Sequence, residues 1–312
     1  MRARRSCMSV PGSSERFLAK ATGVPADQIF FDLEDSVAPL EKEAARQLII
    51  DAVKGNEFAA PTLVVRINGV YTKWCYRDII TIVEAIGDRI DCLMIPKVEY
   101  PSDVVFVDKL VTQIEETMGF ERRIGLEVQI ESAAGLQNIN QIATASDRIE
   151  DLIFGPADMS ASLGLPTVTA GAPIPGYENL DHFHYVLTHI NIAARANNLQ
   201  SIDGPFLLIR DLDAFRAAAM RAKALGYDGK WALHPDQVTV LNEVFTPTQG
   251  EYDKAECLLE HYKQATEVER KGAVMFGKEM IDEASRKMAE VTVARGRAAG
   301  LVREKKVEDF LS

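Results

Sequence analysis

The stretch IFFDLED, residues 29–35, joins a buried-type run to a group of acids. Its first three residues are apolar, whereas three of its last four, Asp32, Glu34 and Asp35, carry carboxylates. In a (β/α)₈ barrel the parallel strands are buried, and their carboxyl ends carry the polar residues of the active site. A core strand that ends in carboxylates is therefore typical of this fold.

Seven further segments resemble this strand, with mostly continuous apolar runs, as expected for parallel strands covered on both faces. Between them, apolar residues recur at helical spacing. Eight strand-then-helix units predict an α/β fold, a (β/α)₈ TIM barrel, for which about 250 residues suffice. The alternative, a doubly wound open sheet, lacks the GxGxxG motif after its first strand. The predicted strands are 6–12, 29–35, 62–68, 92–98, 124–131, 151–158, 201–206 and 229–235; the clearest helices are 39–55, 76–88, 102–119 and 211–226.

Two regions depart from the repeat. Residues 161–180 are rich in Gly, Pro and Thr and predict a long loop, which in compact domains often serves as a lid or binding loop. Residues 1–246 complete the barrel, so 247–312 form a C-terminal helical extension, with helical stretches on either side of a Gly-containing link at 271–282. The extension either packs on its own barrel or caps a neighbouring subunit.

The overall composition argues against several classes of protein. A net charge of −11 makes a duplex nucleic acid an unsuitable partner. Four scattered cysteines without CxxC spacing argue against a zinc site or a secreted disulfide framework. No signal peptide and no apolar stretch of about 18 residues is present, so we expect a cytoplasmic protein without a membrane span. Five basic residues near the start could hold one small anion: Arg2, Arg4, Arg5, Arg16 and Lys20.

Polar residues stand at the end of every predicted strand. One such residue alone often only caps the next helix. Eight of them converging on one mouth indicate a ligand site, because burying so many charges without a ligand is costly. The strand ends carry, in order, Ser13 and Ser14; Asp32, Glu34 and Asp35; Arg66 and Asn68; Lys97; Glu131; Asp158; Asp203; and His234.

Glu131 and Asp158 follow adjacent strands and suit a hard cation. Mg²⁺ takes one or two carboxylates and completes its shell with water and substrate oxygens; Mn²⁺ is the alternative ion. The competing interpretation pairs either acid with Arg66 or Lys97 instead. Arg66 has the fork geometry to bind a substrate carboxylate or carbonyl, and the backbone N–H groups around Ala157 could hold a second anionic end.

Two further residues are ambiguous on their own. His234, in the sequence ALHP, is expected to line a ligand rather than act as a base. Lys97 raises the possibility of Schiff-base chemistry, but neighbouring acids would raise its pKa and keep it protonated.

Taken in order, these motifs resemble the citrate lyase β-subunit-like group of the HpcH/HpaI aldolase superfamily, and most closely its malyl-CoA lyases. The resemblance covers nearly the whole chain. The matching pieces are SVPGS (9–13), FDLEDSVAP (31–39), VVRING (64–69), IPKVE (95–99), QIESAAGL (129–136), FGPADMSASLG (154–164), IDGPF (202–206), GKWALHPDQV (229–238), NEVFTP (242–247) and GKEMIDEA (277–284).

The resemblance implies a Mg²⁺-dependent carbon–carbon lyase acting on acyl-CoA and a small α-keto acid, in a homo-oligomer that is a trimer or hexamer. It implies Glu131 and Asp158 as metal ligands, Arg66 as the group that polarises the keto acid, and Asp282 as an acid reaching a neighbour's active site. The implied CoA contacts are Val10, Ser14, Arg16, Lys20, His234 and Pro235. Ser14 stands where many relatives carry Arg, which puts the individual CoA contacts in question.

The expected reaction is reversible cleavage of (S)-malyl-CoA, or of β-methylmalyl- or citramalyl-CoA, to acetyl- or propionyl-CoA and a keto acid such as glyoxylate. Asp282 is favoured over Asp35 for proton exchange, and Glu34 and Asp35 remain proton-handling or metal-orienting candidates. Three alternatives share the site: a citryl-CoA lyase subunit, a malyl-CoA thioesterase, and an aldolase that does not use CoA.

Overall fold

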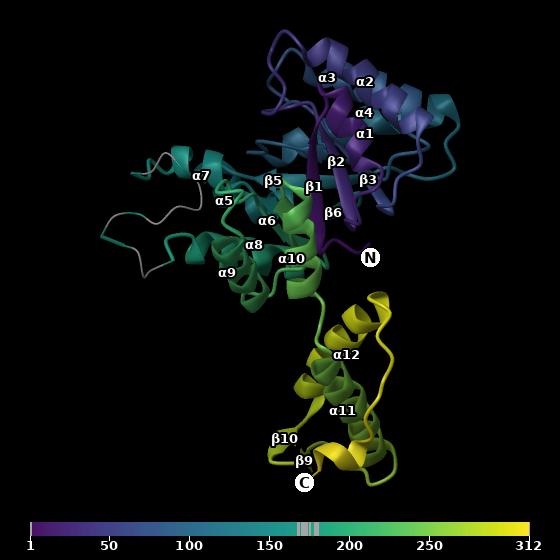
Figure 1. Ribbon diagram of the computed structural model, residues 1–312, viewed down its shortest axis with the longest axis vertical. Helices are drawn as coiled ribbons and strands as arrows, with labels where there is room; N and C mark the ends of the chain where they lie inside the picture. The colour runs from purple at the N-terminus through teal and green to yellow at the C-terminus, as the bar shows by residue number, and fades with distance from the viewer. Residues whose placement is uncertain (1, 167–168, 170–173, 175, 178–180, 312) are drawn as a thin grey trace. The chain divides into compact units, whose positions relative to one another are not determined.

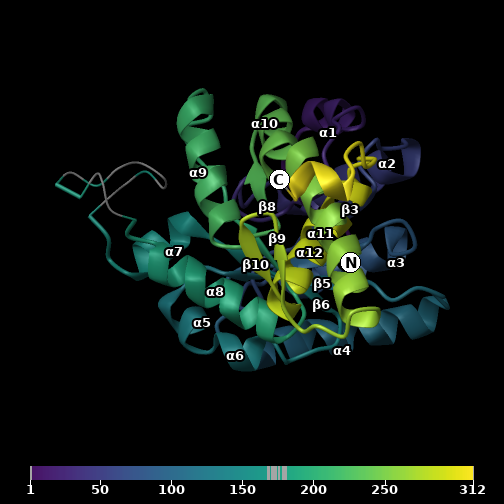
Figure 2. The same ribbon diagram turned by 90° about the horizontal axis from the view of Figure 1, so that it is seen from below.

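The computed structural model describes residues 2–166, 169, 174, 176–177 and 181–311. Eight parallel strands close into a barrel in chain order, and helices surround it (Figures 1 and 2). The (β/α)₈ prediction is confirmed. The strands are β1 (Ser6–Pro11), β2 (Gln28–Asp32), β3 (Thr62–Arg66), β4 (Cys92–Ile95), β5 (Gly125–Ile130), β6 (Ile149–Phe154), β7 (Gln200–Asp203) and β8 (Gly229–Ala232).

Local capping explains where several outer helices begin and end. The side chain of Ser14 accepts from the backbone N–H of Phe17 at the start of α1, and Asp211 accepts from that of Ala214 at the start of α9. Gly119 ends α4 in the left-handed conformation, at φ 70°. The helices are α1 (Glu15–Ala21), α2 (Lys42–Gly55), α3 (Cys75–Ile86), α4 (Pro101–Met118), α5 (Ala133–Gln137), α6 (Ile139–Ile142), α7 (Pro156–Ser162), α8 (His184–Ala196), α9 (Leu212–Ala224) and α10 (Pro235–Phe245).

The predicted strands were mostly too long at their carboxyl ends, because their last residues belong to the loop or the helix that follows each strand. Part of the predicted loop at 161–180 is the end of α7, and much of the rest lies outside the described residues. None of the described helices combines the length and apolar character needed to cross a membrane.

Alternate residues of the strands fill the barrel in layers, as the period of two requires. The middle layer is apolar and includes Phe30 against Trp231, with ring centroids 4.4 Å apart. A polar layer lies at the amino end of the strands, where the guanidinium of Arg4 is 3.0 Å from the carboxylates of both Glu127 and Asp151. All three of these charged side chains are almost completely buried. A second polar layer lies at the carboxyl end, which we call the barrel mouth.

Asp203 does not point into the mouth as the sequence suggested. Ile202 and Trp231 belong to the interior cluster, so their neighbours Asp203 and Lys230 face the outer helices. The Lys230 ammonium contacts the Asp203 carboxylate at 2.7 Å and lies 6.0 Å from the ring of Phe215, on α9. This buried ion pair lies between the strands of the barrel and the helices that surround it.

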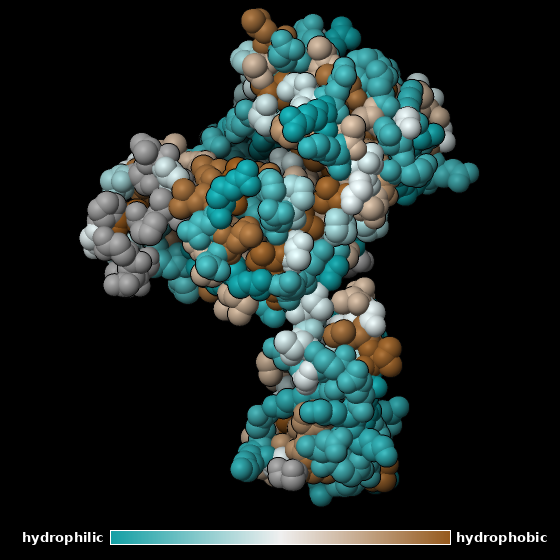
Figure 3. Space-filling view, viewed as in Figure 1, coloured by the Kyte–Doolittle hydropathy of each residue, from teal (hydrophilic) through white to brown (hydrophobic). Residues whose placement is uncertain are grey.

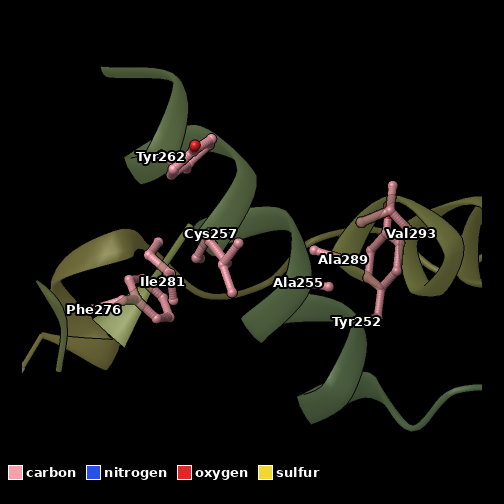
Figure 4. Packing of buried hydrophobic residues seen from close by; sticks show 9 residues of the cluster. Tyr252, Ala255, Cys257, Tyr262, Phe276, Ile281, Ala289 and Val293 are labelled. Atoms are coloured by element: carbon pink, nitrogen blue, oxygen red, sulfur yellow. The ribbon is translucent and has the colours of Figure 1, made fainter. Parts of the chain in front are cut away.

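The chain divides into two compact units, Met1–Glu243 and Val244–Ser312. In the second unit, residues 271–282 connect two helices, as the sequence suggested, and they also contain an antiparallel hairpin that was not predicted. Phe276 and Ile281 of that hairpin face the long helix near Cys257 (Figure 4). The elements of this unit are α11 (Gln249–Glu267), β9 (Val274–Phe276), β10 (Glu279–Ile281), α12 (Glu283–Ala298) and the 3₁₀ helix η1 (Val307–Phe310).

The core of the second unit also depends on one close helix contact. Tyr252 lies beside Ala289 and Val293 (Figure 4), and a Cβ at Gly296 would meet its ring at 2.2 Å. Gly296 therefore lets α12 approach α11. On the face seen in Figure 3, hydrophilic residues cover most of the second unit.

Candidate active site

A doubly hydrogen-bonded ion pair lies on one side of the barrel mouth. Asp32 and Arg66 are paired in register on β2 and β3. Nε and Nη2 of Arg66 donate to the two carboxylate oxygens of Asp32, both at 2.7 Å. Burial alone would raise the pKa of Asp32, but the charge and hydrogen bonds of Arg66, together with hydrogen bonds from Ser36 and Glu34, lower that pKa. The guanidinium carbon also lies 5.3 Å from the Trp231 ring, so Arg66 is fixed from two directions.

The remaining nitrogen of Arg66 faces the other acids of the mouth. Nη1 of Arg66 lies 3.3 Å from the Glu34 carboxylate. Because Asp32 occupies the opposite edge of the guanidinium fork, Nη1 is the part of Arg66 best placed to bind a substrate oxygen.

Glu131 follows β5 and is almost completely buried at the mouth. Its carboxylate accepts from the backbone N–H of Lys97 at 2.7 Å and from the side-chain amide of Gln129 at 2.5 Å. Burial, followed by the nearby negative charge of Asp158, raises the pKa of Glu131 to about 8. A cation beside Glu131 would stabilise the charged form of this buried carboxylate.

Glu131 and Asp158 together fit a magnesium ion. Both supply oxygen, they come from adjacent strand ends, and the Asp158 side chain is 37% exposed, so one member of the pair is open to solvent. Within the described residues, no group of three or more His, Cys, Asp and Glu side chains is arranged to hold a metal. Two carboxylates are nevertheless a usual protein contribution to Mg²⁺, which keeps water and substrate oxygens as further ligands.

Glu34 and Asp35 meet at the ammonium of Lys97. Nζ of Lys97 lies 2.5 Å from the Glu34 carboxylate and 3.1 Å from that of Asp35. Burial raises the pKa of Glu34, whereas hydrogen bonding to Glu34 and the Lys97 charge lower that of Asp35 against its own partial burial. Glu34 is buried and Asp35 exposed, so the two acids occupy different depths of the mouth.

The residues predicted to contact CoA are more dispersed. Val10 is buried and paired with Phe31, and the Ser14 side chain caps α1. Arg16 and Lys20 are exposed on α1. Of the five basic residues considered for a small anion, three are already in ion pairs: Arg2 with Asp91 and Glu150, Arg4 with the buried acids, and Arg5 with Asp27.

The other predicted residues lie at helix starts. His234 precedes α10, and its Nδ1 accepts from the backbone N–H of Asp236 at 3.2 Å, while Pro235 begins the helix and is exposed. Ala157 is exposed in the first turn of α7. Asp282 belongs to the second unit, where its carboxylate accepts from the backbone N–H groups of Ala284 and Ser285 and caps α12.

Comparison with known proteins identifies the family of this chain. Residues 5–235 match the family described as HpcH/HpaI aldolase/citrate lyase. The chain belongs to that family. It is 40% identical to an L-malyl-CoA/beta-methylmalyl-CoA lyase of Cereibacter sphaeroides, over 91% of each chain. It is 34% identical to a malyl-CoA/beta-methylmalyl-CoA/citramalyl-CoA lyase of Chloroflexus aurantiacus, over 86% of this chain and 80% of that one.

A solved structure extends the comparison. The CitE protein of Mycobacterium tuberculosis, crystallised with magnesium, acetoacetate and coenzyme A, superposes with a TM-score of 0.72 at 26% identity, covering 94% of this chain and 97% of that one. The family resemblance inferred from the motifs is therefore confirmed.

The sequence interpretation missed the groups that support the predicted residues. Asp32 was recognised as an acid at a strand end but not as the partner of Arg66, because the strand register was unknown. Gln129 was missed although GLEVQIE contains a clear signal: Glu127, Gln129 and Glu131 alternate with apolar residues and so face the barrel interior together.

Proposed function

We propose that this protein is a Mg²⁺-dependent carbon–carbon lyase that cleaves (S)-malyl-CoA or its β-methyl homologue to a short acyl-CoA and glyoxylate. The observation that carries the proposal is the convergence of Glu131, Asp158 and Arg66 on one barrel mouth, in a chain that is 40% identical to a malyl-CoA lyase over 91% of its length. Glu131 and Asp158 would hold the ion.

The protein's residues have separable tasks in this reaction. Breaking the bond between the hydroxyl-bearing carbon and the carbon next to the thioester leaves a carbonyl on one product and an enolate on the other. Nη1 of Arg66 donates to the oxygen that becomes the carbonyl, while Asp32 keeps the guanidinium in place. When bound, the metal supplies Lewis-acid stabilisation to the substrate oxygens.

Two protons must move to complete the cleavage. The substrate hydroxyl loses one, and the enolate carbon gains one to give the acyl-CoA. Glu34 and Asp35 lie near Arg66 and Lys97, within the mouth, and are candidates for the first transfer. We assign the second to Asp282 of a neighbouring subunit, which requires at least a dimer; a trimer or hexamer is the form that the family resemblance favours.

Several of the residue roles rest on the sequence alone. The roles of Val10, Ser14, Arg16, Lys20, His234 and Pro235 in CoA binding stay predictions, as do Ala157 as an anion contact and the cytoplasm as the protein's location.

The direct test is a panel of CoA esters assayed with and without Mg²⁺, following release of keto acid and of free thiol. We expect glyoxylate from (S)-malyl-CoA, no free thiol, and no turnover without metal. Asp158→Asn should abolish activity, whereas Asp147→Asn, at an exposed acid preceding β6, should not. Full activity of Asp158→Asn would refute the metal role.

One comparison favours a second candidate. The chain is 31% identical to the citrate lyase β subunit of Leuconostoc mesenteroides, over 90% of this chain and 89% of that one. Cleavage of citryl-CoA in preference to malyl-CoA would support that function. Release of thiol without keto acid would instead show a thioesterase.

A further inference from the structure

Lys97 has an unusual backbone conformation at the centre of the site. Its φ is 53°, in the left-handed region that residues other than Gly seldom adopt. Such a conformation persists only where the surroundings impose it. Here it accompanies a hydrogen bond from the backbone N–H of Lys97 to the Glu131 carboxylate, at 2.7 Å.

The Lys97 side chain touches three more carboxylates. Its Nζ lies 2.5 Å from Glu34, 3.1 Å from Asp35 and 3.7 Å from Asp158. The first two contacts are hydrogen bonds, whereas the third exceeds hydrogen-bond length. The ammonium is therefore held chiefly by the acids that follow β2 and only loosely by Asp158.

This arrangement leaves the acids of the mouth in two groups. Arg66 pairs with Asp32 and also contacts Glu34, and Glu34 and Asp35 share Lys97. Within the described residues, Glu131 is hydrogen-bonded by a backbone N–H and an amide rather than by a charged side chain, so Arg66 and Lys97 act on it through their charge alone, and Asp158 has only the long contact to Lys97. Glu131 and Asp158, which are proposed to hold the metal, therefore have the weakest contacts with cationic side chains among these acids.

We propose that Lys97 is a positioning residue that reserves Glu131 and Asp158 for the divalent ion by neutralising Glu34 and Asp35. The Lys97 ammonium repels the divalent ion and so lowers the affinity of the site for it to a moderate level. Because it occupies Glu34 and Asp35, it also prevents the ion from binding to these two acids. The inference rests on the proposed function, because it assumes that Glu131 and Asp158 bind Mg²⁺.

Removing the ammonium should strengthen metal binding. A unit charge and a divalent ion about 5 Å apart repel each other enough, even in a water-like dielectric, to change affinity by about tenfold. We therefore expect Lys97→Met to bind Mg²⁺ about tenfold more tightly than the unmodified protein in calorimetric titrations. The difference should shrink at high salt, because salt screens this repulsion; a purely structural role would not show that dependence.

Companion variants separate charge from backbone effects. Lys97→Gly lacks the ammonium and adopts the left-handed conformation freely, so it should also bind Mg²⁺ more tightly. Lys97→Arg keeps the charge and should restore the original affinity. Lys73→Met removes an exposed lysine whose Nζ lies 5.2 Å from the Trp74 ring, and it should leave the affinity unchanged.

The outcomes distinguish this inference from the proposed function. If Lys97→Met and Lys97→Gly are folded and bind Mg²⁺ no more tightly than the unmodified protein, the inference is wrong and the lyase proposal stands. If the unmodified protein binds no Mg²⁺, or if Glu131→Gln binds it equally well, the metal site itself is refuted and the inference fails with it.

Discussion

Replacing Gly155 by Ala should damage the site through one buried methyl group. Gly155 caps α7 directly after β6, with φ −105° and ψ 92°, so alanine can adopt its backbone without strain. A Cβ built there would lie 2.3 Å from Oε2 of Glu131, 2.4 Å from its Cβ and 3.0 Å from Nε2 of Gln129, whereas ordinary contact begins at 3.4 Å. Oε2 must therefore retreat by about 1.1 Å, and a displacement of about 1 Å at an active site can cost about 100-fold in rate.

We expect Gly155→Ala to lower kcat/KM by about 100-fold and to weaken Mg²⁺ binding measured by calorimetry. Overpacking should also lower the free energy of unfolding by about 1–3 kcal/mol, measured with urea. The matched control is Gly55→Ala at the end of α2, where an added Cβ meets nothing within 4 Å. Unchanged metal affinity and activity in Gly155→Ala would show that the position of Glu131 is not what Gly155 protects.

Three further outcomes follow from the two polar layers. Arg4→Met should lower the free energy of unfolding by about 3–5 kcal/mol, measured with urea, because it leaves Glu127 and Asp151 buried without their counter-charge. Burial raises the pKa of both acids above their unfolded values, so the stability they contribute is present at low pH and lost as pH rises. The urea midpoint should therefore fall as the pH is raised above the ordinary pKa of a carboxyl, about 4, and Glu127→Gln should reduce that fall; an equal fall would contradict the assignment. Asp32→Ala should lower kcat by about 100-fold or more, because the Arg66 guanidinium loses the two hydrogen bonds that hold it in place. A normal kcat would exclude a positioning role for Asp32.

The strand-then-helix repeat was predictable because buried parallel strands appear in the sequence as continuous apolar runs. The segments between these runs have apolar residues at helical spacing. IFFDLED identified β2 and its acids, since a continuous apolar run followed by charge is typical of a buried strand that ends at the barrel mouth. The hairpin at β9 and β10 was not predictable in the same way. Its strands have three residues each, which is too short to show the alternation of a strand. A glycine such as Gly277 occurs in many kinds of loop, so it does not identify a hairpin turn.

Contacts between side chains on different strands of the barrel depend on the strand register, which cannot be read from the sequence. Arg66 and Lys97 were both assigned to the mouth, yet only the structure shows that Arg66 is fixed by Asp32 and that Lys97 gathers the acids. Asp203 illustrates the opposite error. Its place at a strand end suggested the mouth, but a shift of one residue in the alternation turns its side chain toward α9.

Both ends of the barrel interior are polar, so polarity alone does not mark the active site. At the amino end, Arg4 lies within 3.0 Å of two fully buried acids, and raised pKa values allow that cluster to hold a proton in place of a second cation. At the mouth, where five carboxylates gather, the ion pairs found among the described residues come from Arg66 and Lys97, and the side chains of Lys97 and Asp158 are 39% and 37% exposed. A divalent ion can therefore enter from solvent and supply the missing charge there, whereas at the other end Arg4 already does so. The difference in charge balance, rather than the acids themselves, is what favours the carboxyl end of this barrel as the proposed catalytic one.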